Sequence, residues 1–187
     1  YLGLRCLCHN ILQTENNPSS WGGPPNNPEE PCMSGAHLHL ILNHLPLLGV
    51  IFAIPLLVIG MRKPSPDLQK AALVMFTLSG LISPIVHLSG EQGEQELQNW
   101  PGISREVIYS HDVAGDLAIL ITCLLGAFSL LGYWQTRHHP QRTGRIHLFI
   151  LVLAAVAAVA LTRAAYLGGQ IFHGESVQHS RTYINGP

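Results

Sequence analysis

Four long apolar runs dominate the chain and restrict the folds that it can adopt. They cover residues 37–61, 68–89, 108–134 and 146–172. Each is close to the ~20 residues with which a helix crosses a hydrocarbon core of about 30 Å. Lipid offers the backbone no hydrogen-bond partners, so such runs must be helical, and none alternates with the period of two of a membrane barrel. The sequence therefore predicts an all-α bundle of four transmembrane helices.

The composition agrees with a lipid bilayer as the surroundings of the chain. Hydrophobic residues make up 47% of the sequence and charged residues only 11%, which is too apolar for an ordinary soluble domain. The formal net charge is -1, and the sequence contains no run of Lys and Arg. Nucleic acid is therefore excluded as a partner, because binding it requires a basic surface.

Basic residues predict the orientation of the helices. They cluster in the first and third connections between the runs, whereas the middle connection is mainly acidic. Lys and Arg are enriched in cytoplasmic loops, so we expect both termini and the middle connection to face outward (N-out/C-out). In a bacterial inner membrane this outer side is the periplasm. The basic residues of the two connections are Arg62, Lys63, Lys70, Arg137, Arg142 and Arg145.

The sequence divides into a tail, a membrane domain and a second short tail. Residues 1–36 include TENNPSSWGGPPNNPEEP, a stretch without apolar periodicity, and are predicted to be a disordered or spurious tail. In the second case residues 1–32 are a leftover upstream of a natural start at Met33. Residues 37–173 form the predicted membrane domain, and 174–187 a short outer tail. The CLCHN at 6–10 lacks the C-x-x-C-H spacing of covalent haem attachment.

Histidines recur at one level of the predicted bundle. Each helix contributes one to the outer third of the bilayer or its interface, and polar groups at that depth are costly and often functional. We therefore predict a site at the outer face, with His37 and His39 in reserve as ligands. The inner histidines 138, 139 and 147 are expected to be solvated. The four outer histidines are His44, His87, His111 and His173.

Two charged residues and a row of small residues lie inside the apolar runs. Asp116 and Arg163 are predicted to form an ion pair between the third and fourth helices. Alternatively, Arg163 holds a haem propionate or another anion, with Asp116 in a proton path. The fourth run is rich in alanine, which favours close packing and predicts a central position in the bundle. Gly80 and Gly115 leave room for a flat ligand or for close helix approach.

The first helix carries a family resemblance. HLILNHLP, with His39, His44 and Pro46, resembles the His-Pro-x-x-x-His-Phe-Pro opening of a bacterial family of small four-helix membrane proteins of unknown function. Leu40 and Leu45 replace the first proline and the phenylalanine of that motif. His111 is similar to the third-helix histidine of the family. SGE at 89–91 and LGGQIFHGESV at 167–177 resemble its Gly-Asp pair and its closing Gly-Gly, aromatic and Gly pattern.

The resemblance covers residues 37–177 and implies a redox role. Some relatives are joined to Rieske-type or c-type cytochrome domains, which implies electron transfer at the outer face. The first hypothesis is accordingly a b-type cytochrome that moves electrons between the quinol pool and an outer-face redox protein. Haem iron takes two axial ligands from facing helices of a bundle. We expect two of the four outer histidines in this role, with Arg163 as the propionate partner.

Two other hypotheses stay open. A site for Zn, Fe or Mn would combine imidazole and carboxylate ligands for metal-assisted hydrolysis or metal passage. A non-catalytic membrane anchor or interaction subunit of a redox complex would need neither group. The sequence contains no H-E-x-x-H motif, and we identify no catalytic triad or phosphate loop, so nothing marks it as an enzyme of a conventional soluble type. The metal set would be His87, Glu91, Glu94, His111 and Asp112.

Overall fold

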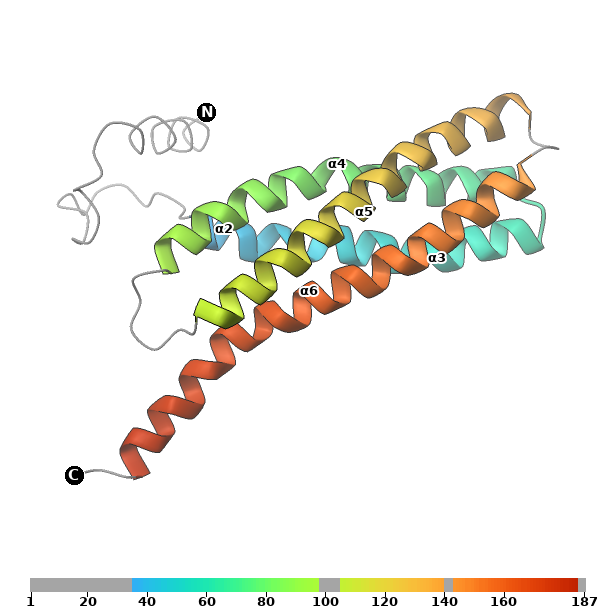
Figure 1. Cartoon of the computed structure of the whole chain (residues 1–187). Coiled ribbons are helices and arrows are strands. Elements are labelled where there is room, and N and C mark those ends of the chain that lie inside the picture. The colour runs from blue at the N-terminus through green and yellow to red at the C-terminus, as the bar shows by residue number, and fades with distance from the viewer. Residues whose placement is uncertain (1–34, 98–104, 140–142, 185–187) are drawn as a thin grey trace, which may run out of the picture.

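The computed structural model describes residues 35–97, 105–139 and 143–184, and this part of the chain is entirely helical apart from short turns (Figure 1). The predicted tail 1–36 lies almost wholly outside these residues. The helices are α2 (Gly35–Leu42), α3 (His44–Arg62), α4 (Pro66–Leu97), α5 (Arg105–His138) and α6 (Gly144–Ile184).

Four helical segments are long and apolar enough to cross a membrane. They are His37–Arg62, which combines α2 and α3, Pro66–Gln95, Arg105–His138 and Gly144–Ile171. The first three contain a predicted apolar run and the fourth contains all but the last residue of one, so the prediction of a four-helix membrane bundle is confirmed. Large apolar side chains such as Phe52 and Val159 cover the outside, as expected of a surface that faces lipid.

A short turn at Asn43 separates α2 from α3 without ending the span. The backbone N–H of Asn43 donates to the carbonyl of His39 at 2.9 Å, so the helical hydrogen bonding continues through the turn. Pro46 lies in the first turn of α3, where a missing N–H removes no intrahelical bond. α3 therefore begins at His44, and Pro46 fits within its first turn.

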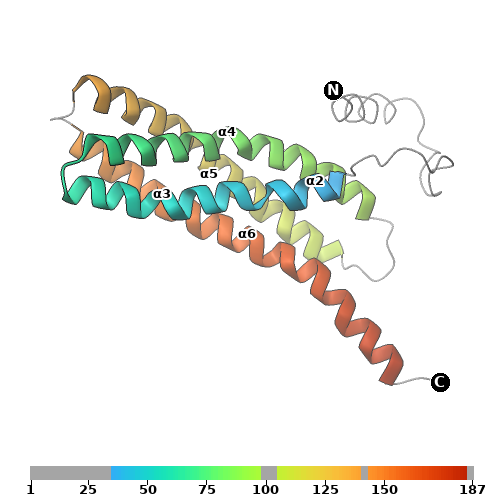
Figure 2. The ribbon, with the colours of Figure 1, turned by 180° about the vertical axis from the view of Figure 1, so that it is seen from behind.

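The described helices bring four chain segments together at one end of the bundle. The start of α2, the end of α4, the start of α5 and the middle of α6 lie there (Figures 1 and 2); we call it the histidine end. The turns that join α3 to α4 and α5 to α6 lie at the opposite end, which we call the basic end. α6 continues as a helix to Ile184, into the segment predicted to be a tail.

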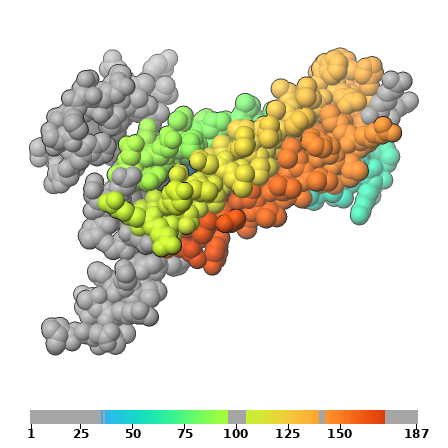
Figure 3. Space-filling view, in the orientation of Figure 1, coloured from blue at the N-terminus to red at the C-terminus, as the bar shows by residue number. Residues whose placement is uncertain are grey.

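The helices form a ring in which α4 and α5 are the best covered neighbours. α4 packs against α3 and α5, and α6 packs against α5 and α3, so α3 and α5 lie diagonally across the bundle. α4, α5 and α6 lie side by side on the face in Figure 3. Only 17% of the apolar window of α6 is buried, against 39% for α4. The prediction that the fourth helix is central is therefore wrong, because alanines such as Ala155 and Ala165 face outward.

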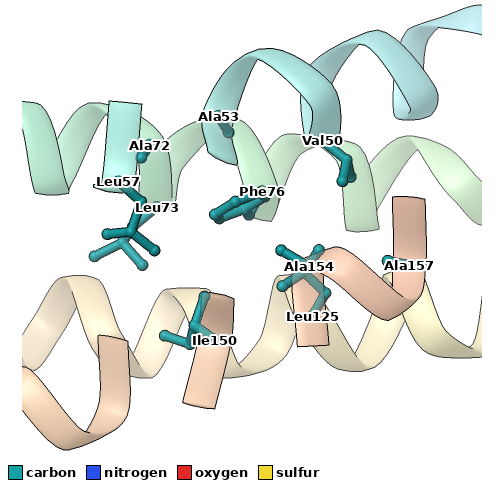
Figure 4. Close-up of a cluster of buried hydrophobic side chains, with 10 residues drawn as sticks. All are labelled: Val50, Ala53, Leu57, Ala72, Leu73, Phe76, Leu125, Ile150, Ala154 and Ala157. Carbon is teal, nitrogen blue, oxygen red and sulfur yellow. The ribbon is translucent and has the colours of Figure 1, made fainter. Parts of the chain in front are cut away.

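Large side chains fill the basic half of the bundle. Leu57, Leu73, Phe76, Leu125 and Ile150 are fully buried and pack together from all four helices (Figure 4). Close-packed protein interiors lose dispersion contacts whenever a side chain is shortened. This half is therefore held by the packing of its own side chains.

A buried histidine lies near the basic end. His147 is 1% exposed, and its Nε2 lies 2.9 Å from the hydroxyl oxygen of Thr136. That hydroxyl donates to the carbonyl of Gly132, so its oxygen accepts a hydrogen bond from His147 Nε2–H. The prediction that His147 is solvated is wrong, because His147, Ile150, Ala154 and Ala157 form the inward stripe of α6.

Two glycines let α4 and α5 touch. A Cβ added to Gly80 would lie 2.8 Å from the Cα of Gly126 and 2.9 Å from the carbonyl oxygen of Thr122, distances that force a neighbour to move. Small residues permit such backbone contact in membranes. Of the two roles predicted for Gly80, close helix approach is therefore the one observed. Gly115 has no such neighbour within 4 Å.

Candidate ligand site at the histidine end

Two histidines from diagonally opposite helices meet in the bundle. The ring centroids of His39, on α2, and His111, on α5, lie 6.3 Å apart, and the ring planes are inclined by 86°. Both side chains are half-buried. The sequence held His39 only in reserve, and the fold makes it the partner of His111.

Each imidazole is anchored by one nitrogen to a neighbouring helix. His39 Nδ1 lies 3.0 Å from the carbonyl oxygen of Val86 on α4, and His111 Nδ1 lies 2.9 Å from that of Ala164 on α6. A carbonyl only accepts, so Nδ1 carries the proton and Nε2 keeps its lone pair. Metal-ligating histidines show this arrangement, in which the outer hydrogen bond fixes both tautomer and ring orientation.

A glycine accompanies each of these carbonyls four residues further along its helix. A Cβ added to Gly90 would lie 3.0 Å from His39 Cε1, and one added to Gly168 would lie 3.0 Å from His111 Cε1. Both imidazoles therefore occupy space that a side chain would fill. The same arrangement therefore occurs twice, once between α2 and α4 and once between α5 and α6. In each case the histidine lies on the first helix, and the carbonyl and the glycine lie on the second.

Small side chains and one unsatisfied polar atom lie next to the histidine pair. Ala114, Ala118 and Ala164 form a separate buried cluster. Asn43 lies one helical turn after His39, and its Oδ1 is buried without a hydrogen-bond partner in the described part of the chain. An unpaired acceptor of this kind costs about 1–3 kcal/mol. The interior here is lined by alanine methyl groups. Asn43 Oδ1 is a polar atom in it that could accept a further hydrogen bond.

The other predicted ligands are not part of this pair. His44 is exposed, because His39, Asn43, Pro46 and Val50 form the inward stripe and the next residue after Asn43 turns away from it. The side chain of His173 lies outside the described residues. His87 forms a separate group with two carboxylates.

Asp116 contacts His87 rather than Arg163. Its Oδ1 lies 3.5 Å from His87 Nδ1, and within the described ranges no ion pair joins Asp116 to Arg163. Arg163 is exposed, because Ala164, its neighbour, occupies the inward stripe of α6. The predicted Asp116–Arg163 pair is thus replaced by a contact between α4 and α5.

The alternative metal set does not come together as one group. Glu91 lies 3.4 Å from His87, whereas His111 is turned toward the Ala164 carbonyl on α6. Among residues 35–97, 105–139 and 143–184, no three His, Cys, Asp or Glu side chains form a group that would hold a metal ion. The arrangement that is present offers two imidazoles, which are enough only for a metal that brings its other ligands.

Fold and site together define an integral membrane protein of four helical spans with a histidine pair across the bundle. No family model, curated protein or solved structure matches the chain. Neither the resemblance predicted from the sequence nor a function therefore gains support from these comparisons.

Proposed function

We propose that the protein is a membrane-bound b-type haem protein for electron transfer, with His39 and His111 as the axial ligands. The observation that carries the proposal is the cross-bundle pair of imidazoles, each fixed through Nδ1 to a backbone carbonyl. This leaves two Nε2 lone pairs available to one group in the bundle interior. Four-helix bundles hold cofactors between facing helices in this way.

The spacing of the rings would allow both imidazoles to hold one metal ion. With an imidazole nitrogen about 2.0–2.1 Å from a metal and about 1.1 Å from its own ring centre, two such rings would have centroids at most about 6.3 Å apart. The observed separation is 6.3 Å. A tetrahedral site would bring two rings closer, to about 5 Å.

The number of ligands also favours haem over a bare ion. The porphyrin supplies four nitrogens, so haem iron needs two protein ligands, whereas Zn sites need three or four. The described residues offer the pair but no group of three. The short side chains of Ala114, Ala118 and Ala164 suit an apolar macrocycle better than a hydrated ion.

The residues of this chain would hold and tune the cofactor. Bound haem supplies a metal centre that carries one electron at a time. The carbonyls of Val86 and Ala164 orient the imidazoles and raise their basicity, a recognised means of adjusting a haem potential. Gly90 and Gly168 let the rings lie against the helix backbone.

The basic residues support an outward orientation of the proposed site. Arg62, Lys63 and Arg137 lie at the basic end, which the positive-inside rule assigns to the cytoplasm. The histidine end then faces the periplasm of a bacterial inner membrane. Electrons would pass from the quinol pool to an outer-face redox protein, in keeping with the family resemblance predicted from the sequence.

The test is the haem content of the purified protein. The full chain is purified in mild detergent from cells with sufficient haem and iron, and reduced and oxidised visible spectra are recorded together with elemental analysis. We expect a Soret band and reduced α and β bands in the wild type. His39→Ala and His111→Ala should each retain less than about a tenth of the haem, because five-coordinate attachment loses one of two ligand bonds.

His44→Ala is the matched control, since His44 lies in the same segment and is exposed. It should keep its haem. Size-exclusion profiles and thermal unfolding establish that each variant is folded. Full haem in both pair variants would refute the ligand assignment. Stoichiometric metal without haem would support the bare-metal hypothesis, and neither group would support the interaction subunit.

A further inference from the structure

A second group of titratable side chains lies between α4 and α5, apart from the histidine pair. His87 Nδ1 is 3.5 Å from Asp116 Oδ1, and His87 Nε2 is 3.4 Å from Glu91 Oε1. Both ring nitrogens therefore face a carboxylate, one on the same helix and one on the neighbouring helix. We call His87, Glu91 and Asp116 the carboxylate–imidazole group.

The group is accessible at the surface of the membrane spans. The side chains of His87, Glu91 and Asp116 are 34%, 53% and 60% exposed. His87 lies about 12 Å along the helix axis from the end of its span at Gln95. Apolar side chains surround it in sequence and are exposed as well, including Leu88 and Leu117. Ionisable residues at such positions are expensive in lipid and mark functional sites by default.

Each ring nitrogen of His87 faces a carboxylate acceptor. A neutral imidazole has one N–H and can donate to one carboxylate only, whereas an imidazolium donates from both nitrogens. Uptake of one proton therefore completes both contacts of His87. A carboxylate of the group is a second acceptor close by.

The group lies directly beside the proposed haem ligands. His87 follows Val86, whose carbonyl anchors His39. Asp116 follows His111 by five residues, about 7.5 Å along the α5 axis. A molecule that meets the group from the lipid is thus brought next to the site that would take its electrons.

We propose that the carboxylate–imidazole group is the binding and deprotonation site for a lipid-soluble hydroquinone. The proposal rests on the proposed haem function, which names the one-electron oxidant. Each hydroquinone loses two O–H protons and two electrons to become a quinone. One proton goes to His87 and the other to a carboxylate of the group. The two electrons would leave one at a time, through the haem that His39 and His111 would hold, to an outer-face acceptor.

Binding is measured without reference to haem. Decylubiquinone and a menaquinone analogue are titrated into the detergent-solubilised full chain, and bound quinone is separated by rapid filtration. We expect saturable binding of at least one of them to the wild type, and at least a tenfold loss of affinity in His87→Gln and Asp116→Asn. Glu106→Gln is the matched control, because Glu106 is an exposed carboxylate in the first turn of α5. It should bind like the wild type.

Electron input is measured on the haem-loaded protein by stopped-flow absorbance. Decylubiquinol and menaquinol analogues should reduce the haem of His87→Gln and Asp116→Asn at least tenfold more slowly than that of the wild type. Dithionite should reduce all variants alike, because it delivers electrons without a hydroquinone site.

The two measurements separate this inference from the proposed function. Saturable quinone binding that depends on His87, in a protein that holds no haem, would support the site and overturn the haem proposal. A haem-loaded wild type that binds neither analogue, or variants that bind and react like the wild type, would overturn the hydroquinone site alone. A drop in thermal stability with unchanged binding would mean that His87 and Asp116 only join two helices.

Discussion

The two ends of the bundle use opposite kinds of interior. Toward the basic end, Phe76, Leu125 and Ile150 fill the space between the helices, and the buried His147 is paired with Thr136. At the histidine end the buried cluster consists of alanines, and the imidazoles lie against glycines. The two ends therefore differ in the size of the buried side chains.

The contrast indicates that the basic half of the bundle mainly stabilises the fold, whereas the histidine end serves the proposed ligand. A filled interior resists change because every lost methylene leaves a cavity. An interior of short side chains holds less packing energy, and it can accept a flat group that supplies the missing contacts. We therefore expect substitutions at the two ends to affect different measurements.

Phe76→Ala should have the largest effect on stability. Phe76 is fully buried among large side chains, so its truncation should lower the free energy of unfolding by about 2–4 kcal/mol. Titration with denaturing detergent in mixed micelles measures this. Phe52→Ala is the control, because Phe52 is 59% exposed and faces lipid in both variants. Equal loss of stability in both would mean that the basic half is not the packed part of the bundle.

Gly168→Val should weaken the ligand site rather than the fold. Its side chain would meet His111 at a position where even a Cβ lies 3.0 Å from the ring. We expect haem affinity to fall at least tenfold, about 1.4 kcal/mol, as measured by haem transfer to apomyoglobin. Gly169→Val is the control, since Gly169 has no neighbour within 4 Å. If the two variants hold haem equally well, the space that Gly168 leaves beside His111 has no role in ligand binding.

Thr136→Val should have the smallest effect of the three. The change keeps the shape of the side chain and removes the acceptor of His147 Nε2–H. Hydrogen bonds between membrane helices contribute about 1 kcal/mol, so we expect a stability loss of this size with unchanged haem content. Thr162→Val, at an exposed threonine of α6, is the comparison. Haem loss in Thr136→Val would show that the two ends are coupled.

The fold followed from the sequence because span length and hydropathy are local properties. The predicted run 37–61 became the span His37–Arg62, and the run 108–134 became the middle of α5. Rotation about each helix axis is not local, since it depends on which stripe packs against which neighbour. This is why the fourth helix was assigned to the centre and why His147 was expected to be solvated.

The candidate site was predictable only in part for the same reason. Their shared depth in the membrane identified His111 and His87 as candidates. Depth does not show whether a side chain points into the bundle or toward lipid. His44 and Arg163 lie at a suitable depth and are exposed. His39 was recognisable by one signal, its position on the stripe that continues through Asn43, Pro46 and Val50. The carbonyl partners carry no sequence mark, because every residue supplies a backbone carbonyl, whereas Gly90 and Gly168 lie within the segments 89–91 and 167–177 that carry the family resemblance.

The contact between Gly80 and Gly126 has a geometric consequence for both ends. Figure 1 shows α5 crossing α4, and two straight rods that touch at one crossing diverge in both directions from it. The angle at this crossing therefore sets the width of the gap between α4 and α5 at each end at once. A single pair of missing side chains in the middle of the membrane thus fixes the point from which α4 and α5 diverge toward both ends of the bundle.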